Sequence, residues 1–290
     1  MRNWKSKFFT FSEASDLNFY MKLYKTEKIF IIFSLIGLII LLFIILPIAK
    51  TILTHSPSTL YSVAKEPQVQ NAIWLSIYAS FLTSIIACLL GTPLAYLLAR
   101  KNFFGKSIVE AIIDLPLAVP HTVAGIAILM IFGKKQFIGS LFNEYLDIRF
   151  VGTLEAVILG MLFVSMPFMV NSAREGFESI NYRVELAART LGASQFEVFR
   201  RVSLPLAKRG IFTGMILTWA RSISEFGAVF LLAYYVSFWN PLTREESSAM
   251  IAPVLIADQF LQYGLERSSS IAALLLIVCL TLFIILRTLT

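Results

Sequence analysis

Long apolar blocks separated by short polar segments dominate the pattern of this 290-residue chain. Five blocks contain no Asp, Glu, Lys or Arg, and they cover residues 29–49, 71–99, 115–133, 156–173 and 268–286. About 20 residues of helix cross the hydrocarbon layer of a bilayer, so each block predicts a membrane-spanning helix. A sixth block, 211–235, carries Arg221 and Glu225, and we expect it to span as well.

The basic residues predict how these helices are oriented, because Lys and Arg are enriched in cytoplasmic loops. With the N-terminus inside, 17 of the 25 Lys and Arg residues fall in inner segments and 7 in outer ones. We therefore expect an all-α protein of the cell membrane with both termini in the cytoplasm. A cytoplasmic segment, 1–28, precedes one transmembrane domain, 29–290. The expected spans are about 29–49, 71–99, 113–133, 153–173, 208–235 and 268–288.

Composition excludes several classes of protein. A chain that is 57% hydrophobic and 15% charged is not a soluble globular domain. The net charge of +7 is spread over the membrane edges without a separate basic domain, which argues against a nucleic-acid partner. Cys88 and Cys279 lie inside predicted spans, so they imply neither a disulfide framework nor a metal site.

The sequence also argues against an enzyme. It shows no paired intramembrane Asp, no Ser and His on adjacent turns, and no His/Glu cluster with metal-ligand spacing. Gly105-Lys106-Ser107 looks like the end of a phosphate-binding loop, but Arg100 stands where that motif needs Gly. We therefore expect neither catalysis nor a cofactor in this chain, and any ATP chemistry would belong to another subunit.

The polar segment 181–205 predicts a helix, a tight break and a second helix. Its apolar residues recur mostly at three- and four-residue steps, the period of a helix with one apolar stripe. Gly192 can take the left-handed conformation that closes a helix, and Ser194 with Glu197 forms a capping box that starts another. Pro205 disfavours helical geometry at the preceding residue, so the second helix is expected to stop there. The pattern alone fits a docking surface and a plain solvated helix equally well.

The same segment resembles the EAA loop of ABC-transporter permease subunits. The resemblance lies in Ala187-Ala188, Leu191, Gly192 and, after nine residues, Val202-Ser203-Leu204-Pro205. It implies a type I ABC importer permease, with a cytoplasmic coupling helix between the fourth and fifth spans that docks on an ATPase subunit. The implied coupling residues are Glu185, Ala187, Ala188, Gly192, Ala193, Leu204 and Pro205. The family's Glu aligns with Leu186, so Glu185 lies one place early, a rotation of roughly 100° on a helix.

Two charges within the fifth predicted span are candidate pathway residues. Arg221 is ten residues from Ile211, or about 15 Å along a helix and close to mid-bilayer. A charge at that depth costs about 3 kcal/mol or more. Glu225 lies one turn on, and Thr218 and Ser222 share the face. The set predicts either a neutralised pair that ties helices together or the polar lining of a translocation path.

The run 221–228 resembles a segment of permeases for molybdate, tungstate and sulfate. This resemblance implies a tetrahedral oxyanion that an extracytoplasmic binding protein delivers to a homodimer, which moves it through the dimer interface with two copies of the ATPase. An importer of another solute, such as phosphate, ferric ion or polyamine, stays open. A secondary carrier or channel also stays open, although it would need no docking segment.

Prolines predict interruptions in several helices. Pro116 and Pro120 weaken the start of the third span, next to His121, which is either a pathway group or a structural residue. Pro47 is compatible with the end of the first helix, and Pro167 is expected to break up the fourth.

Small residues predict close helix packing. Small and hydroxyl residues line one face of the second span, and Gly210 and Gly214 form a small-xxx-small pair at the start of the fifth. Beyond the fifth span, residues 250–262 predict a short outer helix with Pro253 near its start.

Overall fold

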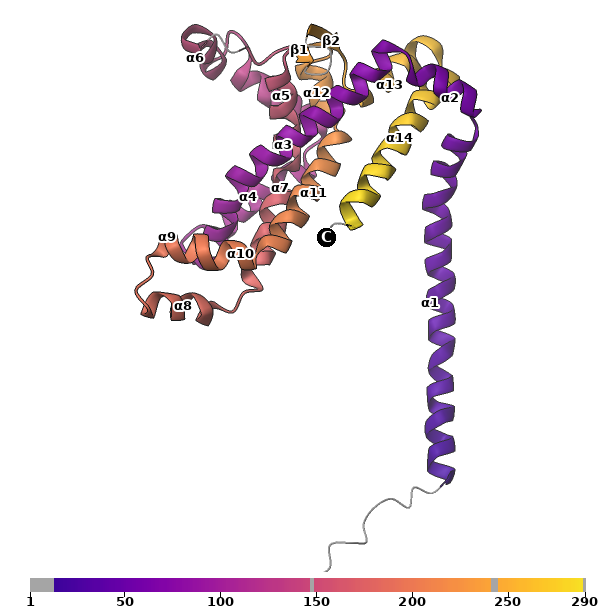
Figure 1. Cartoon of the computed structure of the whole chain (residues 1–290), viewed down its shortest axis with the longest axis vertical. Coiled ribbons are helices and arrows are strands. Elements are labelled where there is room, and N and C mark those ends of the chain that lie inside the picture. The colour runs from indigo at the N-terminus through magenta and orange to yellow at the C-terminus, as the bar shows by residue number, and fades with distance from the viewer. Residues whose placement is uncertain (1–12, 147–148, 241–244, 289–290) are drawn as a thin grey trace, which may run out of the picture. The chain divides into compact units, whose positions relative to one another are not determined.

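The structure is a computed structural model that describes residues 13–146, 149–240 and 245–288 (Figure 1). The chain divides into two compact units, Met1–Thr54 and His55–Thr290. The described part of the first unit is one long helix, α1 (Glu13–Leu53), of which Ile29–Leu53 is long and apolar enough to cross a membrane. The expected cytoplasmic segment 1–28 lies partly outside the described residues, and its last part belongs to α1.

The described residues of the second unit are mostly helical. Its first half contains α2 (Pro57–Ala64), α3 (Pro67–Arg100), α4 (Lys106–Ala118), α5 (His121–Phe132), α6 (Phe137–Leu146) and α7 (Leu154–Glu178). Its second half contains α8 (Tyr182–Thr190), α9 (Gln195–Val198), a π-helical turn (Phe199–Ser203), α10 (Leu204–Leu206), α11 (Lys208–Ile223), α12 (Gly227–Leu232), β1 (Val236–Asn240), β2 (Glu245–Ala249), α13 (Ala252–Tyr263) and α14 (Leu265–Thr288).

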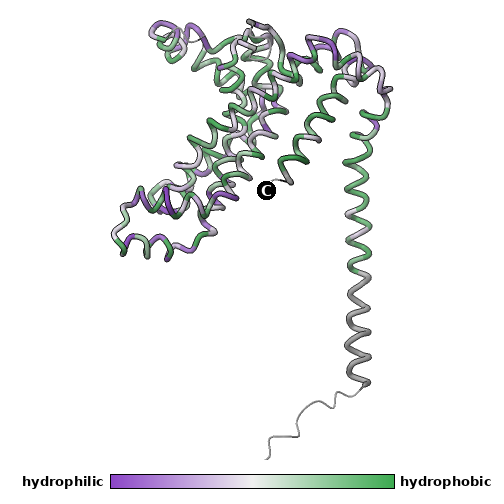
Figure 2. Tube along the Cα trace, in the orientation of Figure 1, coloured by the Kyte–Doolittle hydropathy of each residue, from purple (hydrophilic) through white to green (hydrophobic). Residues whose placement is uncertain are grey.

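Helices α3, α7 and α11 pack side by side at the centre of the second unit (Figure 1). The α8–α9 region lies at one end of these helices, and the β1–β2 hairpin lies at the other. Figure 2 shows that hydrophilic residues gather around α8 and α9, whereas hydrophobic residues follow α14. The hydrophobic pattern along the sequence therefore corresponds to distinct regions of the molecule.

Close backbone approach joins α7 to α11, as the small-residue pattern predicts. A Cβ atom added to Gly210 would meet the Cα of Gly176 at 2.7 Å and the carbonyl of Ser172 at 2.9 Å. The Ser172 hydroxyl donates to the carbonyl of Gly210 at 3.0 Å. The predicted stripe of small residues on α3 is also buried, and it consists of Ser76, Ser80, Thr83, Ser84, Ala87 and Gly91. Close packing at the predicted small residues is thus confirmed on α3 and α11.

The structure corrects the number of continuous spans. Among the described residues, four helices are long and apolar enough to cross a membrane, or five if a bent pair counts as one. That pair is α4 and α5, which meet at 116° across Val119 and Pro120. The predicted span 113–133 is therefore two helices. Pro120 lacks the N–H that would continue α4, and its ring disfavours helical geometry at Val119, which is extended.

The predicted span 208–235 is also two helices, because α11 ends at Ile223 and α12 begins at Gly227. Glu225 lies in the break, and its carboxylate accepts the backbone N–H of Ala228 at 2.9 Å. A side-chain acceptor at the start of a helix replaces the partner that the orphan N–H groups lack. Glu225, a charged residue within the apolar block 211–235, thus caps the start of α12.

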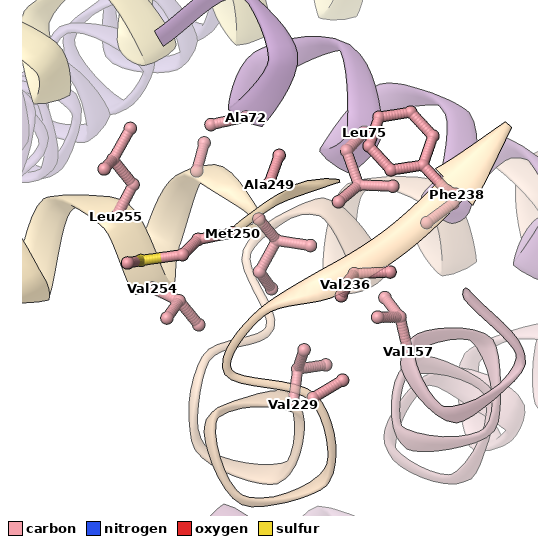
Figure 3. Close-up of a cluster of buried hydrophobic side chains, with 14 of the residues drawn as sticks. Ala72, Leu75, Val157, Val229, Val236, Phe238, Ala249, Met250, Val254 and Leu255 are labelled. Carbon is pink, nitrogen blue, oxygen red and sulfur yellow. The ribbon is translucent and has the colours of Figure 1, made fainter. Parts of the chain in front are cut away.

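The expectation of an all-α fold is wrong in one place, where β1 and β2 form an antiparallel hairpin. Val236 pairs with Ala249, and Trp239 pairs with Glu246. Side chains of the hairpin reach a buried apolar cluster that includes Leu75 of α3 (Figure 3). The alternation of Val236 and Phe238 with polar Ser237 suits a strand with one buried face.

The proline predictions have mixed outcomes. Pro47 and Pro167 lie inside α1 and α7, which continue past them, so neither ends or divides its helix. In membrane helices, neighbouring groups can take the hydrogen bonds that a proline frees. The short helix predicted over residues 250–262 is present as α13, with Pro253 in its first turn.

Candidate functional site

The segment 181–205 forms the predicted helix, break and helix. Asn181 begins α8, and its side-chain oxygen accepts the backbone N–H of Arg183 at 3.0 Å. Gly192 has a φ of 91°, and the N–H of Ala193 bonds to the carbonyl of Ala188 at 3.1 Å. This is the left-handed closure expected of a glycine after a helix.

The predicted capping box is present at the start of α9. The Glu197 carboxylate accepts the backbone N–H of Ser194 at 2.9 Å, and the Ser194 hydroxyl accepts the N–H of Glu197 at 3.3 Å. The bond from the Ser194 backbone, followed by that from its side chain, lowers the pKa of the Glu197 carboxyl. The break is therefore specified on both sides of Gly192 by local bonds.

The prediction that the second helix stops before Pro205 is wrong. Helical geometry continues from α9 through the π-helical turn and α10 to Leu206. The N–H of Leu204 bonds to the carbonyl of Phe199, five residues back, in the wider register of a π-turn. Pro205 then lies directly after the π-helical turn, in the first turn of α10.

Most of the predicted coupling residues are accessible. Ala187, Gly192 and Pro205 are exposed, and Ala188, Ala193 and Leu204 are half-buried. The apolar residues at the break project from the chain, because Leu191 is 89% exposed and Phe196 is 68% exposed. Large apolar side chains that gather on an exposed surface are typical of a site that another molecule covers.

Glu185 differs from the rest of the coupling set because its side chain is only 4% exposed. The Arg100 side chain donates to both of its oxygens, at 2.9 and 3.0 Å from Nε. The Ser203 hydroxyl donates to the same carboxylate at 2.7 Å. Sequence reasoning missed Arg100 and Ser203, since a partner 85 positions away leaves no local signal.

A second cluster joins three of the predicted pathway residues. Arg221 Nη2 lies 2.8 Å from Glu225 Oε2 and 2.8 Å from Nε2 of His121, which begins α5. Glu225 is 1% exposed, whereas the Arg221 side chain is 20% exposed. The guanidinium is thus anchored on one side, and its Nη1 lies 3.4 Å from the Ser224 hydroxyl. An open pocket above it is lined by His121, Thr122, Arg221, Ser224, Phe226 and Gly227.

Thr218 and Ser222 do not join this cluster. Both are fully buried, and the Ser222 hydroxyl donates to the hydroxyl of Ser165 on α7 at 3.0 Å. Their side chains belong to the contact between helices. Ser224 and Thr122 line the pocket instead. Ser224 was missed because α11 ends before it, and a helical period cannot predict such a break.

Comparison with known proteins decides the family. Residues 91–289 match the family described as "Binding-protein-dependent transport system inner membrane component". The chain belongs to this family. It is 39% identical to the molybdate/tungstate transport system permease protein WtpB of Thermococcus kodakarensis, over 88% of this chain and 94% of that protein.

Other permeases extend the comparison. WtpB of Methanocaldococcus jannaschii is 39% identical over 90% of this chain and 96% of its own. The sulfate transport system permease protein CysT of Synechocystis is 30% identical over 86% of this chain and 85% of its own. The fold is shared with a bacterial ABC transporter involved in the import of the polysaccharide alginate, with a TM-score of 0.67 at 17% identity over 92% and 98% of the two chains.

Proposed function

We propose that this permease is the membrane subunit of an ATP-driven importer of a tetrahedral oxyanion, with molybdate or tungstate as the first candidates and sulfate as the third. The observation that carries the proposal is the Arg221 guanidinium, which is held by Glu225 and His121 yet partly open to a pocket. The names of the relatives, which share 30–39% of their residues with this chain, support the same substrates.

The cluster is better suited to letting an anion pass than to binding it tightly. Guanidinium N–H groups make charge-assisted bonds to oxyanions. The Glu225 carboxylate balances the charge of Arg221, so an anion would meet directed donors without a large net attraction. Weak binding is what transport needs, because a tightly held substrate would not leave.

Segment 181–205 would be the coupling region, docked on the ATPase from the cytoplasm. Its exposed Leu191 and Phe196 would enter a groove of that subunit, and Ala187, Gly192 and Pro205 lie on the accessible surface beside them. Two permeases and two ATPases would form the complex, with the pathway between the permeases. ATP binding would draw the ATPases together and open the permeases outward, where an extracytoplasmic binding protein releases the anion.

Six crossings follow if each broken pair, α4 with α5 and α11 with α12, crosses the bilayer once together with the four long spans. This arrangement leaves both termini and the coupling region in the cytoplasm. A cysteine-labelling experiment at Gly192→Cys would report the side directly, since a reagent that cannot enter the cell should fail to label it.

Reconstitution tests the function as a whole. The permease would be placed in liposomes with its ATPase and binding protein, and ATP hydrolysis and uptake would be measured with molybdate, tungstate, sulfate and phosphate. We expect molybdate or tungstate to stimulate both. If phosphate, ferric ion or a polyamine alone stimulated hydrolysis and uptake, that solute would be the substrate instead of an oxyanion such as molybdate. Uptake that follows an ion gradient without ATP would identify a secondary carrier.

A further inference from the structure

We propose that Arg100, Glu185 and Ser203 form a clamp that fixes the coupling region to the membrane helices, so that a force applied at its exposed face moves α3 and α7 directly. This inference rests on the proposed docking of segment 181–205. Glu185 is then a positioning residue that acts inside this chain, whereas a coupling carboxylate on the surface would act on the ATPase.

Arg100 joins three parts of the chain. It is the last residue of α3, and its side chain is 9% exposed. Besides both oxygens of Glu185, it reaches the carbonyl of Phe177, to which Nη2 donates at 2.8 Å. That carbonyl lies in the last turn of α7, where a cation interacts favourably with the C-terminal end of the helix.

Within α8, burial is concentrated at Glu185. Every residue of this nine-residue helix is described, and Glu185 is the one that is buried. An amphipathic helix normally holds its place through an apolar face, but the apolar residues Val184 and Leu186 of α8 are exposed. The fully buried contact of α8 is therefore made by one carboxylate and the groups that bind it.

Ser203 connects the other side of the coupling region to the same carboxylate. Its hydroxyl lies 2.7 Å from Glu185 Oε1, and the residue is fully buried. It is the last residue of the π-helical turn. A π-turn contains one more residue than an α-turn and so rotates the residues that follow it; here the turn ends with Ser203 facing Glu185.

Aromatic rings pack beside the clamp. Tyr96 packs edge-on against Phe177 at 5.2 Å between ring centroids and lies 4.9 Å from Phe199. Phe177 is fully buried. Ion pairs away from solvent are screened less by salt, and removing one partner leaves an uncompensated buried charge. The clamp is consequently stiff while complete and weak when one member is lost.

Distance measurement on the permease tests the clamp by itself. Spin labels at Lys101→Cys on the end of α3 and Arg189→Cys on α8 would be placed in a chain whose Cys88 and Cys279 are replaced by Ser. We expect one narrow distance distribution in nanodiscs, broadened by Glu185→Gln. The matched control is Glu175→Gln, which changes an exposed carboxylate of α7 that lies outside the clamp and should leave the distribution narrow.

Coupling is measured on the full complex with ATPase and binding protein. Glu185→Gln should raise the ATP hydrolysed per anion imported by roughly threefold or more, because the buried Arg100 loses its counter-charge. The exchange Arg100→Glu with Glu185→Arg should restore part of the coupling. Rescue is the decisive outcome, since a Glu185 that contacts the ATPase would not be restored by a change in α3.

Three results would overturn the clamp. They are a narrow distribution in Glu185→Gln, wild-type coupling in that variant, and loss of ATPase affinity without rescue by the exchange. A wild-type complex that imports nothing with ATP would instead overturn the proposed function, and the distance measurement on the permease alone would still decide whether the clamp exists.

Discussion

Arg221 is stable in an apolar segment because its neighbours balance its charge. A charged side chain at mid-bilayer costs about 3 kcal/mol or more. Here Glu225 supplies the opposite charge, and the ring of His121 lies within 2.8 Å of the guanidinium. The pair could be predicted from its spacing of four residues along one helix, whereas the contact with His121, 100 positions away, could not.

Replacement of Arg221 separates transport from assembly. We expect Arg221→Ala to reduce uptake more than assembly with the ATPase, since the Arg221 side chain is partly exposed and Glu225 keeps its bond to the N–H of Ala228. Uptake should fall by on the order of tenfold or more, because bonds to charged groups contribute roughly 1.5–3 kcal/mol. Uptake of radiolabelled tungstate into proteoliposomes measures this.

Arg149→Ala is the matched control, because Arg149 is exposed and lies outside the cluster. It should transport like the wild type. Wild-type uptake by Arg221→Ala would show that the Arg221–Glu225 pair only ties helices together.

Local signals predicted the elements of segment 181–205, whereas contacts between distant parts of the chain escaped prediction. The closure at Gly192 and the capping box at Ser194 depend on neighbouring residues, so the sequence is sufficient. The hairpin was missed because its second strand, β2, is mostly polar and pairs with a strand that lies across a loop. Pro116 and Pro120 predicted a weak start of the third span, where α4 and α5 separate, whereas the break between α11 and α12 was missed because hydropathy averages over three residues.

Gly192 tests the importance of the break between α8 and α9. A Cβ at this position would meet nothing within 4 Å, so only the backbone conformation, with a φ of 91°, opposes a larger residue. Left-handed geometry costs roughly 1–2 kcal/mol for a residue with a Cβ. We expect Gly192→Val to hydrolyse ATP without uptake while the membrane helices keep their melting temperature.

Gly192→Asn is the matched control for that variant, because Asn tolerates the left-handed region. It should retain most of the uptake. Equal uptake by the Val variant and the wild type would contradict a coupling role for the break.

At the scale of the second unit, small residues specify the packing of α3, α7 and α11. Packing of this kind could be predicted from the sequence as a pattern, since Gly210 and the stripe on α3 recur at helical steps. Which helix each of them touches could not, because Gly176 is the partner of Gly210 and carries no pattern of its own. The 116° bend between α4 and α5 likewise depends on what surrounds the prolines.

Gly210→Val tests this packing. Its Cβ would lie 2.7 Å from the Cα of Gly176, and backbone atoms cannot yield as a flexible side chain does. Overpacking costs about 1–3 kcal/mol, so we expect a lower melting temperature in detergent and a smaller monodisperse fraction. Thr213→Val, at an exposed position of the same helix, should melt like the wild type.

The two helix breaks touch each other. A Cβ on Gly227, at the start of α12, would lie 2.8 Å from the Cβ of His121, at the start of α5. Because the two breaks are in such close contact, a change in the angle of one break requires a change in the other. The helices that follow the breaks, α5 and α12, would therefore move together, and the Arg221 guanidinium lies where the two breaks meet.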